Sequence, residues 1–188
     1  MPGDTITKEE CKARRRELIQ RIEDELEEER SFLDDLFGWG PTVDDVLAKI
    51  CCKGETNGCD CEEVLQYYKD QTAVIKKLEA YLAAGKFTSF PKTTPLATAG
   101  PLGIRPKASC CVKKAVDHME ALFGPLGEGL MPTPTLIAAF YLTFKYFAIQ
   151  SGRDLADFNR ARAEIELGRS RAFRQLLFDI YALCCCRE

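Results

Sequence analysis

The sequence lacks the motifs of the common enzyme classes. It contains a single histidine, and none of its cysteines has the Cys-x-x-Cys spacing of common zinc and redox sites. No phosphate-binding glycine loop, metalloprotease helix or nucleophile elbow is present. These absences favour a non-enzymatic protein but leave the question of an enzyme open. No cofactor is expected, apart from a soft metal such as zinc or copper.

An excess of charge and a long hydrophobic run are also lacking. The formal net charge is −3, so no basic face for nucleic acid is expected. The longest apolar stretch, 136–149, is shorter than the about 20 residues that span a bilayer, which argues against a membrane partner. Residues 1–10 show no signal peptide. The default localisation is therefore cytoplasmic, although the cysteine content also allows an oxidising compartment.

Cysteine, by contrast, is abundant. The chain of 188 residues has ten cysteines, and nine of them stand in adjacent or near-adjacent groups. Each group falls where a helix is expected to begin or end, so the fold can gather the thiols in one place. The groups are Cys51 and Cys52, Cys59 and Cys61, Cys110 and Cys111, and Cys184, Cys185 and Cys186, with Cys11 alone.

Helical periodicity dominates the sequence, and no alternating run indicates a strand. Thr7 with Glu10 and Asp60 with Glu63 have the spacing of helix N-terminal caps, and Ser109 is expected to cap a further helix. Apolar residues at helical spacing predict helices over about 7–37, 42–52, 60–84, 109–123, 134–150 and 154–184.

These patterns predict an all-α fold. We expect a single helical domain over residues 1–188, an antiparallel bundle of about five to six helices, with helix 134–150 as the central apolar helix. Residues 86–108 carry four prolines and are expected to form a long proline-rich crossover loop within this domain.

Antiparallel helices would bring many of the cysteines to one pole of the bundle. If consecutive helices simply alternate in direction, Cys110 and Cys111 lie at the other pole. If the long loop crosses the bundle instead, this doublet joins the cluster and the C-terminal triplet lies at the other pole. Both arrangements stay open. The structural cluster predicted by simple alternation comprises Cys11, Cys51, Cys52, Cys59, Cys61, Cys184, Cys185 and Cys186.

Three chemistries fit such a cluster, and the sequence does not choose among them. Disulfides between helix ends would tie each member of a doublet to a different partner. Thiolates could hold a soft metal, with Cys51, Cys52, Cys59 and Cys61 as the candidate ligands. Free cysteines could also pack as small buried hydrophobic residues.

Cys110 and Cys111 are candidate reactive thiols. They follow Ser109 at the start of a helix, where the helix dipole and nearby lysines favour a thiolate. A catalytic pair with His118 is not expected, because seven residues along a helix separate Cys111 from His118 by about 10 Å.

The leading functional hypothesis is a non-enzymatic helical protein that binds a protein partner or forms a homo-oligomer, with cysteines that stabilise the helix ends as disulfides. The alternative is a thiol-based metal-binding or redox protein. A third hypothesis is a membrane-active helical protein that uses helix 134–150.

Overall fold

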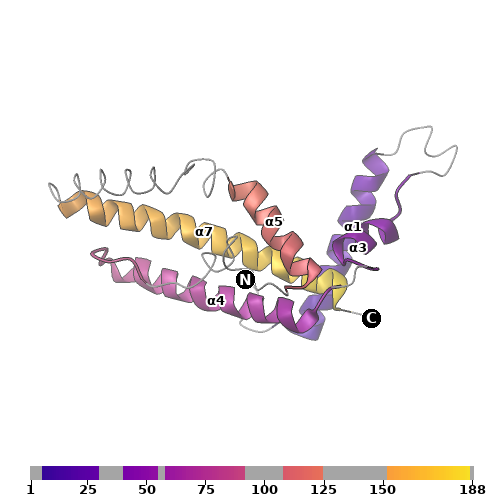
Figure 1. Cartoon of the computed structure of the whole chain (residues 1–188), viewed down its shortest axis with the longest axis horizontal. Coiled ribbons are helices and arrows are strands. Elements are labelled where there is room, and N and C mark those ends of the chain that lie inside the picture. The colour runs from indigo at the N-terminus through magenta and orange to yellow at the C-terminus, as the bar shows by residue number, and fades with distance from the viewer. Residues whose placement is uncertain (1–5, 30–39, 55–57, 92–107, 125–151, 187–188) are drawn as a thin grey trace. The chain divides into compact units, whose positions relative to one another are not determined.

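The computed structural model describes residues 6–29, 40–54, 58–91, 108–124 and 152–186. In this part of the chain every regular element is a helix, which confirms the all-α prediction. The helices are α1 (Lys8–Glu29), α3 (Val43–Ile50), α4 (Cys61–Ala84), α5 (Cys110–Gly124) and α7 (Gly152–Cys184), shown in Figure 1.

The helix boundaries lie close to the predicted ones. The start of α1 and both ends of α3, α4, α5 and α7 agree with the predicted ranges to within two residues. The predicted central helix 134–150, residues 30–37 of the first helix and most of the proline-rich loop lie outside the described residues.

Local capping explains where three of these helices begin. Thr7 and Glu10 form the predicted capping box: the Glu10 N–H donates to Thr7 Oγ1 at 3.2 Å, and the Thr7 N–H donates to Glu10 Oε2 at 3.0 Å. Thr42 and Asp45 make the same reciprocal pair at the start of α3. Asp60 Oδ1 accepts from the N–H groups of the second and third residues of α4.

The chain forms two compact units, divided within three helices between Lys69 and Asp70, Ala115 and Val116, and Arg174 and Gln175. The first unit contains α1, α3, the beginnings of α4 and α5, and the end of α7. The second contains the remainder of α4, α5 and α7. The single domain expected over residues 1–188 stays a prediction.

In the first unit, apolar side chains of α1, α3 and the end of α7 form the core. Leu47 and Leu183 are buried together with Cys51, and Leu18 and Ile22 of α1 pack against them. The core of this unit therefore lies directly beside a cysteine group.

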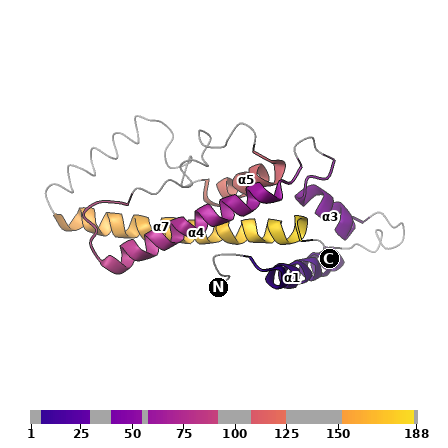
Figure 2. The same cartoon turned by 90° about the horizontal axis from the view of Figure 1, so that it is seen from below.

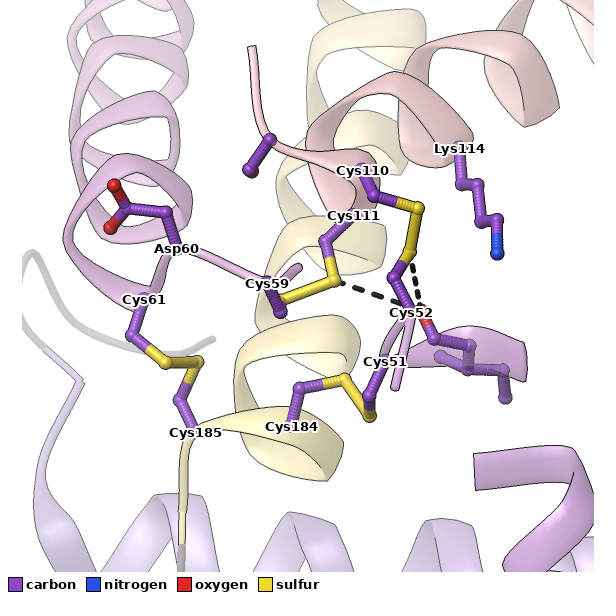
Figure 3. Close-up of a disulfide and its surroundings, with 12 residues drawn as sticks. Cys51, Cys52, Cys59, Asp60, Cys61, Cys110, Cys111, Lys114, Cys184 and Cys185 are labelled. Atoms are coloured by element: carbon purple, nitrogen blue, oxygen red, sulfur yellow. Dashed lines mark hydrogen bonds between the residues drawn. A yellow bond between two sulfur atoms is a disulfide. The ribbon is translucent and has the colours of Figure 1, made fainter. Parts of the chain in front are cut away.

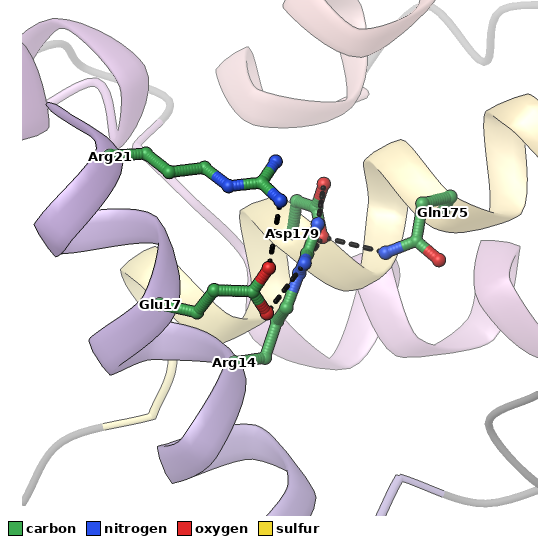
Figure 4. Close-up of polar contacts among 5 residues, drawn as sticks. All are labelled: Arg14, Glu17, Arg21, Gln175 and Asp179. Carbon is green, nitrogen blue, oxygen red and sulfur yellow. Dashed lines mark hydrogen bonds and ion pairs between the residues drawn. The ribbon is translucent and has the colours of Figure 1, made fainter. Parts of the chain in front are cut away.

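An ion pair also joins α1 to α7 in this unit. Arg14 Nε donates to Asp179 Oδ1 at 2.7 Å, and Arg14 Nη2 donates to Asp179 Oδ2 at 3.0 Å (Figure 4). Gln175 donates to the same carboxylate at 2.8 Å, and Glu17 lies against the same arginine at 2.8 Å. Both members of the two-pronged pair are partly buried, which is the setting in which such pairs contribute most.

In the second unit, α4 and α7 lie side by side (Figures 1 and 2). Their contact is a cluster of small and medium apolar side chains, and Glu79 pairs with Arg171 at 2.7 Å. Beyond the end of α4, Phe90 packs against Tyr81, and the Arg162 guanidinium lies 4.2 Å from the Phe90 ring centre. The buried cluster consists of Val74, Ile75, Leu78, Ala163 and Leu167.

Among the described residues, no helix is both long enough and apolar enough to cross a membrane. The third hypothesis depended on helix 134–150, which lies outside these residues.

Acid should weaken the two capping boxes. Hydrogen bonds from Thr7 lower the pKa of Glu10 below 4.5, and those from Thr42 lower the pKa of Asp45 below 3.8. Because the folded-state pKa is the lower one, this stabilisation is present above the unfolded-state pKa and is lost as the pH falls through the folded value. We expect the free energy of unfolding to decrease as the pH is lowered from about 5 to about 3. It is measured by urea denaturation, with circular dichroism as the signal. The double variant Glu10→Gln, Asp45→Asn should show a shallower decline; an equal slope would contradict this account.

Candidate functional site

The candidate site is a cluster of five disulfides in the first unit that uses all ten cysteines. The Cα–Cα distances run from 5.1 to 6.2 Å, within the usual range for this bond. The pairs are Cys11–Cys186, Cys51–Cys184, Cys52–Cys110, Cys59–Cys111 and Cys61–Cys185.

This pairing favours disulfides among the chemistries that the sequence left open, because every cysteine has a partner at disulfide distance. The prediction that neighbouring cysteines bond to different partners is confirmed for all the adjacent groups. All eight cysteines of the cluster predicted by simple alternation take part in these bonds. The Cys110–Cys111 doublet joins them, so the two alternative arrangements each left out one group that the structure includes.

The C-terminal triplet joins the end of α7 to three other elements. Cys184 is the last residue of α7, and the N–H groups of Cys185 and Cys186 both donate to Tyr181 O, at 2.9 and 3.3 Å. This tight turn points the three sulfurs in different directions. They bond to cysteines at the end of α3, at the first residue of α4 and in the first turn of α1.

A different backbone feature separates Cys51 from Cys52. The helix α3 ends at Ile50, and Cys52 takes the left-handed conformation with φ of 54° that usually belongs to glycine. The Lys53 N–H closes the turn by donating to Ala48 O at 2.9 Å. The doublet therefore diverges: Cys51 bonds to the end of α7 and Cys52 to the start of α5 (Figure 3).

The start of α5 is held by backbone contacts as well as by sulfur. The Ser109 N–H donates to Glu63 Oε2 at 2.8 Å, and the Cys110 N–H donates to Gly58 O at 3.3 Å. Glu63 thus accepts a hydrogen bond from the residue before α5 instead of completing the predicted capping box with Asp60. The expected side-chain cap of Ser109 is wrong: its buried hydroxyl has no hydrogen-bond partner among the described residues.

The end of α7 is also stabilised from α1. The Arg15 guanidinium donates to Leu183 O, one of the last carbonyls of α7. A cation at this end of a helix opposes the negative end of the helix dipole.

Taken together, four of the disulfides form a closed ring of elements. Bonds lead from α7 to α3, from α3 to α5, from α5 to the residues before α4, and from the first residue of α4 back to α7. The fifth disulfide attaches α1 to the residues after α7. All five described helices are thereby covalently connected at this cluster.

Two of the disulfides approach each other closely. The Sγ atoms of Cys59, Cys111 and Cys184 all lie within 4.8 Å of one another. This places the Cys51–Cys184 bond next to the Cys59–Cys111 bond (Figure 3). A thiolate metal site would require these bonds to be reduced first.

The four cysteines predicted as metal ligands do not form a close group of sulfur atoms like that of Cys59, Cys111 and Cys184. Cys51, Cys52, Cys59 and Cys61 each bond to a cysteine outside this set. Only Cys59 belongs to the close group of three sulfurs. The sequence prediction missed Cys111 and Cys184 because their approach depends on two helix ends that are distant in the chain.

The predicted reactive thiols are both oxidised in this structure. Cys111 is fully buried and Cys110 nearly so. Their reactivity as free thiols stays a prediction that concerns the reduced protein. His118, which was not expected to act with Cys111, is exposed on α5.

A second feature was missed in the sequence, on α7 in the second unit. Helical periodicity alone does not distinguish Phe158 and Ile165 from the other apolar residues of this helix. In the structure they are 41% and 58% exposed, the most exposed large apolar side chains described. The signal that could have found them is their spacing of seven residues, which places them on one helix face.

This chain matches no protein-family model, no curated protein and no solved structure at a significant level. The function is therefore argued from the geometry of its own residues.

Intact mass provides a direct check on the cluster. The purified, non-reduced protein should weigh about 10 Da less than the reduced protein, since each of five disulfides removes two hydrogens. Iodoacetamide under denaturing, non-reducing conditions should add no mass, because no thiol is free. Alkylation of two or more cysteines in the freshly isolated protein would show that the cluster is incomplete.

Proposed function

We propose that this protein is a disulfide-stabilised helical binding protein of an oxidising compartment, and that it binds a protein helix through the outer face of α7. The observation that carries the proposal is the exposure of Phe158 and Ile165, seven residues apart on this helix. Large apolar side chains exposed together on one face are typical of an interaction surface.

The disulfides support the oxidising compartment. Cytosolic reductants keep most thiols reduced, whereas five bonds that use every cysteine would be stable outside the cytosol. The cytoplasmic localisation favoured by default from the sequence is replaced in this proposal for that reason.

The outer face of α7 has the spacing of a coiled-coil contact. Phe158, Ala161, Ile165 and Gly168 follow one another at intervals of three, four and three residues, and all four are exposed. We call these four residues the α7 seam. A Cβ atom added at Gly168 would meet no atom within 4 Å, so the seam is open at that position. Alternating steps of three and four are the pattern by which two helices pack together.

The opposite face of α7 packs on the core of its own unit. Asn159, Ala163, Leu167 and Ser170 are all buried, and two of them belong to the cluster shared with α4. An ordinary surface helix has one apolar face, which packs on its own core. A second apolar face, turned away from that core, supports binding to another molecule.

Charged residues beside the α7 seam favour a second copy of this chain as the partner. In coiled-coil notation, Phe158 and Ile165 occupy position a. The residues directly before them, Asp157 and Glu164, occupy position g, and the residues four positions after them, Arg162 and Arg169, occupy position e. When two such helices run parallel, each g residue lies near the e residue five positions later in the partner. Glu164 would then face Arg169, and Asp157 would face Arg162.

The same charges oppose an antiparallel pair. In that orientation g residues face g residues and e residues face e residues, so Glu164 would meet another Glu164 and Arg162 would meet another Arg162. Arg169 also has a buried Nε atom without a hydrogen-bond partner among the described residues. A carboxylate from a parallel partner would supply an acceptor on this side of the helix.

A charged residue in the α7 seam should abolish self-association. Ile165→Asp places a carboxylate at the centre of the proposed contact, so this variant should sediment as a monomer at concentrations where the parent chain forms dimers. Ala73→Asp puts the same charge on an exposed position of α4 and should leave dimerisation unchanged. Circular dichroism verifies that both variants fold. A parent chain that stays monomeric over the whole concentration series would refute the second copy as partner.

Charge exchange tests the parallel orientation. Glu164→Lys alone and Arg169→Glu alone should each weaken the homodimer, because like charges would face each other at both symmetric positions. Mixing the two variants should restore association as a heterodimer, since each altered residue then meets an opposite charge. The salt bridge of Glu164 to Arg160 is exposed, and its loss should affect folding little. If mixing gives no recovery, the helices do not pair in the parallel register.

A further inference from the structure

The close approach of two disulfides provides a chemical property that is independent of partner binding. The Cys184 sulfur lies within 4.8 Å of both sulfurs of the Cys59–Cys111 bond. If the Cys51–Cys184 bond were reduced, a free Cys184 thiolate would be held beside an intact disulfide. This is the arrangement that thiol–disulfide exchange requires.

Exposure differs among the four cysteines involved. Cys111 is fully buried and Cys51 is 9% exposed, whereas Cys59 and Cys184 are half-buried. An external thiol has access to the Cys51–Cys184 bond through Cys184, but not to the Cys111 sulfur. Cys184 can approach Cys59 from within the protein.

The helix ends give the exchange a direction. Cys184 is the last residue of α7, where the negative end of the helix dipole disfavours a negative charge on sulfur, an effect that the nearby Arg15 guanidinium reduces. Cys111 is the second residue of α5, where the positive end of the dipole favours a thiolate and makes it a better leaving group. Attack by Cys184 with departure of Cys111 therefore moves negative charge from an unfavourable helix end to a favourable one.

We propose that the Cys51–Cys184 and Cys59–Cys111 disulfides form an exchange site that accepts two electrons from an external dithiol and rearranges to a Cys59–Cys184 disulfide. In the first step, the dithiol is oxidised to its own disulfide, the Cys51–Cys184 bond breaks, and the two protons of the dithiol pass to Cys51 and Cys184. In the second step, Cys184 loses its proton to solvent and its thiolate attacks Cys59 Sγ. The Cys59–Cys184 bond forms, the Cys59–Cys111 bond breaks, and Cys111 leaves as a thiolate that takes up a proton; this step changes no oxidation state.

The released Cys111 has a partner in place. Its sulfur lies 3.6 Å from Ile50 O. In the disulfide this is only a sulfur–oxygen contact, since the sulfur carries no hydrogen. Once Cys111 is a protonated thiol, it can donate to that carbonyl, which stabilises the rearranged state.

The rearrangement would divide the covalent ring. The remaining bonds would connect α1, α4 and α7 to one another, and Cys52–Cys110 would connect α3 only to α5. A two-electron reduction would thereby remove every disulfide between one pair of helices and the other three, although the total number of disulfides would fall by only one. The proposed site is thus a redox switch as well as an exchange site.

Partial reduction of the oxidised full-length chain tests the proposal. The protein is treated with less than one equivalent of dithiothreitol, quenched with acid and alkylated, and the species that has lost one disulfide is sequenced by fragmentation mass spectrometry. We expect a Cys59–Cys184 bond with alkylated Cys51 and Cys111. A species with alkylated Cys51 and Cys184 and an intact Cys59–Cys111 bond would overturn the proposal, and so would any other linkage.

A variant with one free thiol tests the second step alone. Cys51→Ser leaves Cys184 without its partner, and the alkylated residue should then be Cys111, because Cys184 displaces it. The matched control is Cys11→Ser, which frees Cys186; this sulfur is outside the close group, so Cys186 itself should be alkylated. Alkylation of Cys184 in the folded Cys51→Ser variant would refute the internal attack. If that variant does not fold, the partial-reduction experiment on the parent chain still decides.

Discussion

The covalent closure of the helix ends is the constraint on which the first unit depends. The bonds to the C-terminal triplet join residues separated by 124 to 175 positions, so they restrict the unfolded chain far more than a local bond would. Apolar packing beside the bonds is modest: α3 has only eight residues and is too short to be stable alone. Sulfur and packing cooperate here, since Cys51 is itself a member of the buried core with Leu47 and Leu183.

The second unit depends on different physics. It contains none of the cysteines, and α4 and α7 are held by a buried apolar cluster, a surface ion pair and the aromatic contacts around Phe90. Its core also includes polar groups, since Gln71 and Ser170 are buried with side-chain oxygens that have no hydrogen-bond partner among the described residues. Such groups lower stability compared with an apolar core. A partner on the exposed α7 seam, as proposed, would therefore stabilise this unit more than the first.

Local signals in the sequence were sufficient to predict the helices and the position of the cysteines at their ends. Thr7 with Glu10 marks a helix start through contacts three residues apart, and such contacts form whatever the rest of the fold does. The pairing of the cysteines was not predictable in this way. It depends on the left-handed backbone at Cys52 and on Glu63 reaching Ser109, a contact across 46 positions. Periodicity likewise identified Phe158 and Ile165 as apolar but could not tell which face of α7 its own core would cover.

The same disulfide cluster holds the helix ends together and contains two bonds close enough for the proposed exchange, and the order of its connections explains how both are possible. A ring of four bonds keeps α3, α4, α5 and α7 connected when any one of these four bonds is opened, so a single reduction within the ring would not release a helix. Rearrangement has a greater effect than reduction, because the new Cys59–Cys184 bond would duplicate the connection that Cys61–Cys185 already makes. The sulfurs lost from the ring are then those of Cys51, which anchors α3 to α7, and Cys111, which anchors α5 to the residues before α4. In the proposed exchange, the proximity of three sulfur atoms would thus determine how the first unit responds to a dithiol. It would either lose one redundant bond or keep no disulfide between α3 with α5 and the other three helices.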